Sequence, residues 1–215
     1  MHSPSSVSLC DLPLFPLPEV VLFPGRPLPL HIFENRYRLM INTVLENDRK
    51  FGVLLWNPTL SRAVNIGCAT EISDVVRLKD GRMNIMTVGL QRFRVVEIVK
   101  ESPYLIGKVE WLEDSAPDSE ATYAGCMVDK ALRDVVNLAN KLTHKENLMP
   151  DDMPSDPVLL SYWVASLFFN SSIDRQELLE LCDTSARLKK ELTLLDSLKA
   201  ELAARAAIED VFRKK

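Results

Sequence analysis

The chain changes character near residue 114, and this change constrains the fold more than any other feature of the sequence. Before it, short apolar runs alternate with proline and glycine, a pattern typical of strands and turns. After it, long stretches have helical periodicity and contain a single glycine, Gly125. Strands followed by helices indicate an α+β fold, since a parallel sheet would need alternating strands and helices. We therefore predict a β-rich lobe over residues 9–114 and an α-helical bundle lobe over residues 115–212.

The β-rich part contains six or seven short apolar runs and one helical pattern, which predict a partly closed antiparallel barrel with one helix. Residues 12–25 are dense in proline, so they are expected to form edge strands or extended connectors. Phe23-Pro24-Gly25-Arg26 fits a type II turn. Residues 35–47 are expected to form the helix, because their apolar residues fall on one helical face.

The dipeptide Asp80-Gly81 lies between two runs of alternating apolar and polar residues, at 75–79 and 82–86. Such a dipeptide favours a two-residue type I′ hairpin. In that register Leu78 faces Met83 and Val76 faces Ile85, which gives one apolar face and one polar face. A bend or bulge is expected at Gly89, since glycine inside a strand pattern often marks one.

Four helices are predicted in the second half: residues 119–142, 157–169, 174–182, and a last helix that follows Asp183-Thr184-Ser185. The second of these is apolar nearly all round, which indicates a buried central helix.

The sequence contains no signature of an enzyme. The P-loop pattern, H-E-x-x-H and G-x-S-x-G are all missing, and the four cysteines lie more than fifty residues apart. The three histidines cannot form a zinc set without scattered carboxylates. We therefore expect no enzymatic activity, no cofactor and no metal.

The charge and hydropathy of the sequence limit the kinds of partner and the cellular location that are expected for the protein. Residues 1–111 hold 13 Lys and Arg against 11 Asp and Glu, whereas residues 112–215 hold 13 against 19. The acidic second half disfavours nucleic acid and anionic lipid, since both are negatively charged. No apolar run approaches the roughly 18 residues of a membrane-spanning helix, and the N-terminus lacks the pattern of a signal peptide. We expect a cytoplasmic protein without nucleic-acid or membrane partners.

Several motifs, taken together, resemble the N-terminal domain of Lon proteases. They are Leu12-Pro13-Leu14-Phe15-Pro16-Leu17, Val21-Leu22-Phe23-Pro24-Gly25, Leu28-Pro29-Leu30-His31-Ile32-Phe33-Glu34-Asn35-Arg36-Tyr37-Arg38, Gly67-Cys68-Ala69-Thr70-Glu71-Ile72, Asp80-Gly81-Arg82, Val88-Gly89-Leu90-Gln91-Arg92-Phe93-Arg94 and Pro103-Tyr104-Leu105. The resemblance covers about residues 10–205. Asn35 departs from it, because many relatives carry proline there, which suits a first helical turn.

The resemblance implies a PUA-like β-rich lobe followed by a helical lobe, the two forming one Lon N-terminal-like domain. It also implies a role in substrate recognition, without the ATPase and Ser-Lys peptidase parts of Lon. We expect a free-standing, non-catalytic module that binds unfolded or specific protein or peptide substrates, as an adaptor in proteolysis with a protease as a partner. A monomer or a weak homo-oligomer is expected. The alternative is a PUA-like module that binds RNA or a small ligand, which rests on fold analogy alone.

The segment Pro27–Tyr37 is the candidate binding region, because its prolines stiffen it and its apolar residues do not suit a solvated loop. The candidate partner-binding residues are Leu28, Leu30, His31, Ile32, Phe33, Arg36, Tyr37 and Arg38. The open alternative is that this segment only closes the barrel and fixes the helix. In that case Glu34 would accept backbone hydrogen bonds at the helix start or pair with an arginine such as Arg94.

Overall fold

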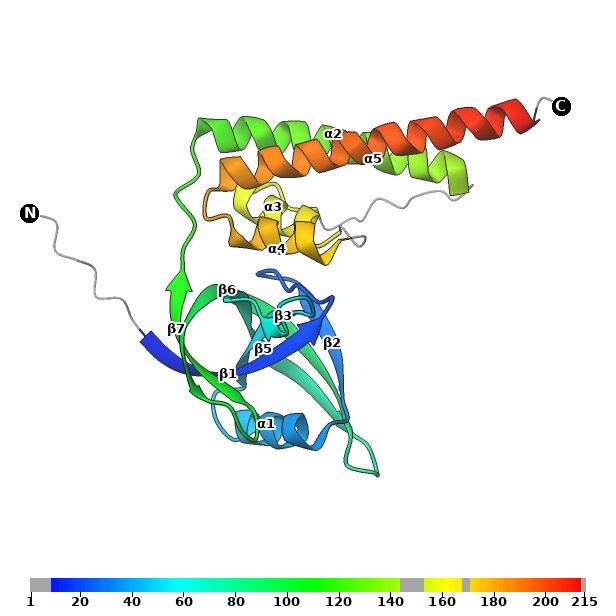
Figure 1. Ribbon diagram of the computed structural model, residues 1–215. Helices are drawn as coiled ribbons and strands as arrows, with labels where there is room; N and C mark the ends of the chain where they lie inside the picture. The colour runs from blue at the N-terminus through cyan, green and yellow to red at the C-terminus, as the bar shows by residue number, and fades with distance from the viewer. Residues whose placement is uncertain (1–8, 144–152, 168–170, 214–215) are drawn as a thin grey trace, which may run out of the picture. The chain divides into compact units, whose positions relative to one another are not determined.

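The computed structural model describes residues 9–143, 153–167 and 171–213 (Figure 1). Close packing divides the chain into two compact units. The first comprises residues up to Glu113 together with Ala165–Glu180, and the second comprises Asp114–Val164 together with the chain from Leu181 onward.

Among the described residues, the first unit contains a seven-stranded sheet, helix α1 and helix α4 (Ser172–Glu180). The strands and α1 are β1 (Leu9–Pro18), β2 (Pro27–Ile32), α1 (Asn35–Leu45), β3 (Lys50–Asn57), β4 (Arg62–Ala63), β5 (Ile66–Arg77), β6 (Met83–Lys100) and β7 (Leu105–Leu112). The strand order is β1-β7-β6-β5-β3-β4, and β2 pairs with β6.

A further pairing between β1 and β3 joins the two sides of this sheet, so the pairings form a closed ring. The sheet is mostly antiparallel, as predicted, but the β1–β3 pair is parallel. The prediction of an all-antiparallel barrel was wrong at this pair. The chain between the two strands runs through β2 and α1, and such a crossover brings the next strand back in the same direction.

Strand β6 is one continuous strand of 18 residues and continues well beyond the run at 82–86 that the sequence indicated. A register shift between β5 and β6 lies next to Gly89, where a bend or bulge was predicted. The turn at Phe23–Arg26 packs against this point, since the Gly25 N–H donates to the Gly89 carbonyl (2.8 Å). The turn itself has the predicted geometry: the Arg26 N–H donates to the Phe23 carbonyl (3.1 Å), and Gly25 has φ 72°.

The hairpin between β5 and β6 has a three-residue loop, so the predicted type I′ hairpin was wrong. The Leu78 N–H donates to the Arg82 carbonyl (2.8 Å) and the Gly81 N–H to the Leu78 carbonyl (3.0 Å). Gly81 has φ 83°, but Asp80 has no positive φ, whereas type I′ requires one at both central residues. A type I turn followed by a left-handed glycine fits these bonds.

The longer loop moves the pairing by one residue. Met83 lies opposite Arg77, and Ile85 lies opposite Val75. Val76, which was predicted to face Ile85, is 52% exposed. This follows from the period of two in a strand, because a slip of one residue exchanges the two faces.

Helix α1 forms as predicted and places its apolar face on the barrel. Tyr37, Met40, Ile41 and Val44 are buried and pack in one core cluster with residues of β1, β3, β5 and β6. The Glu34 side chain makes no capping hydrogen bond at the helix start, contrary to one of the two expectations for it.

In the described part of the second half, four helices follow the strands, in agreement with the sequence: α2 (Ser119–Thr143), α3 (Pro157–Ala165), α4 (Ser172–Glu180) and α5 (Thr184–Arg213). Helix α3 ends at Ala165, earlier than predicted, and residues 168–169 of the predicted helix lie outside the described residues. Helices α2 and α5 pack against each other in the second unit. Within the described residues, no helix combines the length and the apolar character needed to cross a membrane.

Helix α4 belongs to the first unit, so the compact units differ from the predicted division at residues 165–180. Three side chains explain this. The buried Arg92 donates to the Leu179 carbonyl (2.7 Å), Gln176 donates to the Ile66 carbonyl (3.1 Å), and Arg175 donates to the Glu19 carbonyl (2.9 Å). These bonds between distant segments fasten α4 to the strands.

The second unit contains a buried charged group at the start of α5. Arg187 is fully buried and forms an ion pair with Asp114 (2.9 Å), while its Nε donates to the Ser161 hydroxyl (2.8 Å). One turn further along, the Glu191 side chain is also fully buried, and neither of its carboxyl oxygens has a hydrogen-bond partner. Burial raises the pKa of Glu191 well above its ordinary value, and the nearby Arg187 opposes this only in part.

Candidate functional site

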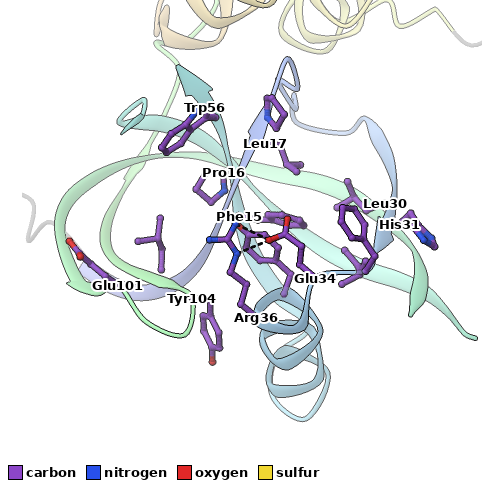
Figure 2. A pocket seen from close by; sticks show the side chains of 15 residues that line it. Phe15, Pro16, Leu17, Leu30, His31, Glu34, Arg36, Trp56, Glu101 and Tyr104 are labelled. Carbon is purple, nitrogen blue, oxygen red and sulfur yellow. Dashed lines mark hydrogen bonds and ion pairs between the residues drawn. The ribbon is translucent and has the colours of Figure 1, made fainter. Parts of the chain in front are cut away.

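The first unit contains a pocket of about 680 Å³ (Figure 2). Its walls come from segments far apart in the sequence. They are Phe15–Pro18 at the end of β1, Leu30–Glu34 with Arg36 and Tyr37 around the start of α1, Trp56 in β3, and Glu101, Tyr104 and Leu105 at the β6–β7 turn. This volume lies within the range of about 300–1,000 Å³ that is typical of ligand sites.

The pocket lies where the pairing of two strands stops. Strand β1 pairs with β7 only over Leu9–Leu14, because β7 begins at Leu105. Strand β2 pairs with β6, and no second partner of β2 is present among the described strands. The second half of β1 and the whole of β2 therefore each present an unpaired edge, and both strands contribute to the pocket wall.

Aromatic rings line the inner part of the pocket. The ring centroids of Phe15 and Tyr37, which both line the pocket, are 4.0 Å apart. Behind them, the ring of the core residue Phe51, which is outside the lining, lies 6.3 Å from that of Phe15. Tyr37 is only 7% exposed. Burial raises the pKa of its phenol above the ordinary value, and the protonated hydroxyl has a hydrogen to donate to a ligand.

Charged groups lie at the rim. Arg36 forms an ion pair with Glu34 (2.9 Å), and its guanidinium carbon lies 4.5 Å from the centre of the Tyr37 ring. The alternative that Glu34 pairs with Arg94 was wrong, since Arg94 forms its ion pair with Glu110 (3.4 Å). The Glu34–Arg36 ion pair is roughly half exposed, so it is accessible to a ligand. An exposed ion pair adds little to the stability of the fold.

Two exposed aromatic residues complete the rim. Phe33 is 61% exposed and Trp56 is 36% exposed. Phe33 stacks with the His31 ring at a centroid distance of 6.1 Å, and His31 Nδ1 is hydrogen-bonded to the Asn84 side chain (2.6 Å). Large apolar side chains held in the open beside a cavity are typical of a binding surface.

Six of the eight candidate residues from the sequence line this pocket: Leu30, His31, Ile32, Phe33, Arg36 and Tyr37. Leu28 instead packs against the core cluster, and Arg38 lies beside the hairpin tip in contact with Gly81. The segment was interpreted either as a binding region or as one that only closes the barrel, and its residues divide between buried and exposed positions. Ile32 and Tyr37 are buried and close the barrel, whereas Phe33 is available to a partner. That the six residues bind a partner stays a prediction.

The sequence did not suggest the other walls of the pocket, namely residues 15–18, Trp56 and the β6–β7 turn. The proline density of β1 was a usable signal, since it marked an edge strand. Nothing local indicates that Trp56 or Tyr104 faces the same cavity, because only the barrel pairings bring them together.

The described residues provide no metal site. No group of three or more His, Cys, Asp and Glu side chains among them could hold a metal ion. Among the described residues, one histidine, His31, lines the pocket, and its Nδ1 is hydrogen-bonded to the side chain of an asparagine, Asn84.

The comparison with protein families identifies the domain. Residues 11–197 match the family described as the substrate-binding domain of ATP-dependent protease La (LON). The chain belongs to this family. The match covers most of the chain, including the barrel, α4 and the first half of α5.

Similar proteins and solved structures agree with this assignment. The chain is 28% identical over 193 residues to Lon protease 2 of Myxococcus xanthus and 26% identical over 193 residues to Lon protease of Anaeromyxobacter dehalogenans, covering 86% of this chain and 23% of each relative. The chain thus spans about a quarter of these relatives.

Two solved structures share the fold. The Lon N-terminal domain protein from Xanthomonas campestris has a TM-score of 0.63 at 26% identity, with 86% of this chain and 98% of that chain covered. The N-terminal domain of Mycobacterium avium complex Lon protease has a TM-score of 0.69 at 16% identity, with 89% and 98% covered. The second comparison shows likeness of fold alone.

Proposed function

We propose that this chain is a non-catalytic module that binds polypeptide substrates, and that the barrel pocket is its binding site. The observation that carries the proposal is a cavity of about 680 Å³ with an aromatic interior and two exposed aromatic side chains, Phe33 and Trp56, at its rim. Polypeptides bind such surfaces by placing apolar side chains in the cavity and excluding water from it. The family description, a substrate-binding domain, supports the same function.

Fluorescence anisotropy with labelled, unfolded β-casein tests this proposal. The double substitution Phe33→Ala with Trp56→Ala is expected to weaken casein binding by about tenfold or more, since buried aromatic anchors dominate binding energies. Tyr123→Ala is the matched control, because Tyr123 is a comparably exposed aromatic residue (68%) on α2, outside the pocket. Thermal melts of all variants establish that the fold is intact. Equal affinities of the double variant and the control variant would refute the assignment of the site.

The alternative function, binding of RNA or a small ligand, receives less support from the pocket. Its charged lining residues are Glu34, Arg36 and Glu101, and this set does not attract phosphate. Titration with a single-stranded RNA at 50 and 200 mM salt separates the two functions. Phosphate-driven binding falls steeply over this range, whereas apolar binding does not.

The biological setting belongs to the same proposal. We propose that the protein is an adaptor in proteolysis, located in the cytoplasm, with a protease among its partners. It would act as a monomer or a weak homo-oligomer, and the helices around α5 would form a bundle lobe. Purified protein is expected to hydrolyse neither ATP nor casein. Affinity capture from native cells, with the Phe33 and Trp56 double variant as control, tests the partner. Light scattering over a range of concentrations tests the oligomeric state.

A further inference from the structure

The edge of β1 beside the pocket offers no backbone donors. Residues 15–18 of β1 pair with β3 on one side. Successive amides of a strand point to opposite edges, and Pro16 and Pro18 have no N–H. The ladder to β3 must therefore use the amides of Phe15 and Leu17, which leaves the opposite edge without a donor.

The edge of β2 has the same character. Strand β2 pairs with β6 over Pro27–Ile32, and its two prolines alternate with Leu28 and Leu30. Because Pro27 and Pro29 cannot donate, the ladder to β6 relies on the amides of the alternate residues, and His31 alone can donate at the other edge. A strand that entered the gap between β1 and β2 would find one N–H over ten residues and could otherwise pair only through the carbonyl oxygens of these edges. A full two-way ladder is therefore not available, and side-chain contacts must supply more of the recognition than in ordinary strand addition.

The charged groups of the lining are not equivalent. Glu34 and Arg36 neutralise each other in their ion pair. Glu101 is exposed, and among the described residues it forms neither a hydrogen bond nor an ion pair. It lies on the side of the pocket away from His31, at the same turn as Tyr104 (Figure 2). Among the described charged residues of the lining, Glu101 is therefore the one without an ion-pair partner, and it lines the same pocket as Tyr104 and Trp56.

Aromatic rings next to a carboxylate form a favourable environment for a cation. The Tyr104 ring already has a cation near it, since Lys100 Nζ lies 5.9 Å from its centroid, but Lys100 does not line the pocket. A ligand ammonium or guanidinium at the pocket would gain a charge interaction with Glu101 and ring contacts with Tyr104 or Trp56. A ligand carboxylate at the same place would be repelled.

We propose that the pocket selects polypeptide segments in which a bulky apolar side chain has a lysine or arginine beside it. It holds them by side-chain contacts rather than by strand addition, and Glu101 determines the preference for the cation. This inference rests on the proposed function, because it describes the ligand of the same site. The apolar anchor occupies the aromatic interior near Phe15 and Tyr37, and the cation lies against Glu101.

Three fluorescein-labelled octapeptides test the proposal by anisotropy. One has Leu-Phe-Lys-Leu at its centre, the second has Leu-Phe-Glu-Leu, and the third is the lysine peptide with N-methylated central amides. We expect the lysine peptide to bind about fivefold more tightly than the glutamate peptide, which is typical of one exposed charge contact with ring contribution. Glu101→Gln should bring this ratio close to one, and Glu101→Lys should invert it. Glu71→Gln, which removes an exposed carboxylate of β5 outside the pocket, should leave it unchanged.

The outcomes separate this inference from the proposed function. Equal binding of the lysine and glutamate peptides, or a preference that survives in Glu101→Gln, overturns the cation preference even where casein binds as expected. A loss of tenfold or more with the N-methylated peptide overturns recognition by side chains, because only a ligand that pairs through its backbone needs those amides. Failure of the wild-type protein to bind casein overturns the proposed function itself.

Discussion

Replacing Glu191 with glutamine should make the stability of the protein less dependent on pH. The wild-type carboxyl group is fully buried in the second unit, and neither oxygen has a hydrogen-bond partner. Below about pH 4.5, the ordinary value for a glutamate, the group is protonated in both the folded and the unfolded chain. Above that pH the unfolded chain releases the proton while the folded protein retains it, because burial raises the pKa of Glu191. The free energy of unfolding therefore falls as the pH rises, until the pH reaches the folded-state pKa.

The size of this effect follows from proton linkage. Each pH unit between the two pKa values lowers the free energy of unfolding by about 1.4 kcal/mol. Over the part of the range above pH 5 in which the folded protein still retains the proton, the wild type should lose stability at this rate relative to Glu191→Gln. In a chain of this size, each kcal/mol lost lowers the melting temperature by about 2–4 °C. Arg187 is the charged group that acts on Glu191, and it lowers this pKa by less than burial raises it.

Urea unfolding followed by circular dichroism at pH 5, 6, 7 and 8 measures this difference. Asp196→Asn is the matched control, since Asp196 is an exposed carboxylate on the same helix. Parallel pH profiles for the wild type and Glu191→Gln would show that the buried carboxyl group does not retain its proton, and the reasoning would then be refuted.

Three further substitutions test other parts of the structure. Gly81→Val should lower the free energy of unfolding by about 1–3 kcal/mol, because valine does not suit φ 83°. Thermal melts test this, and Gly81→Asn, which tolerates this conformation, should be milder. Arg38→Glu should leave casein affinity unchanged in the anisotropy assay, since Arg38 does not line the pocket, and a marked loss would extend the site to the hairpin. Arg92→Met should loosen α4, because it removes the hydrogen bond to the Leu179 carbonyl; hydrogen exchange should increase across α4, and unchanged exchange would contradict the role assigned to Arg92.

Helices and strands were predictable where the local pattern matches the buried face. The apolar residues of α1 lie on one face in the sequence, and the same residues are buried in the structure. The Phe23–Arg26 turn was equally predictable, because proline and glycine restrict its backbone directly. The hairpin at Asp80-Gly81 shows the limit. Its glycine has the expected positive φ, but local residues alone did not distinguish a two-residue loop from a three-residue loop, and one residue reverses the faces of the strand.

The candidate site shows the same division. Six of its residues lie in one continuous segment with unusual composition, so the sequence could single them out. Phe15, Trp56 and Glu101 could not be associated with them, because the segments that hold these residues are dozens of residues apart and meet only in the barrel. The ion pair of Glu34 likewise depends on the tertiary structure. Strand β7 places Glu110 beside Arg94, so Arg94 pairs with Glu110, and Glu34 pairs with Arg36.

The sequence by itself determined the order of strands and helices, the apolar faces and the proline-rich edges, since each of these depends on residues close together in the chain. Only the tertiary structure decided three further features: the parallel pairing of β1 with β3, the packing of α4 in the same unit as the strands, and the pocket in the gap between β1 and β2. Each of these depends on contacts between distant segments. Such contacts form only when the whole chain minimises its exposed apolar surface and satisfies its buried polar groups together, so no local window of the sequence contains them.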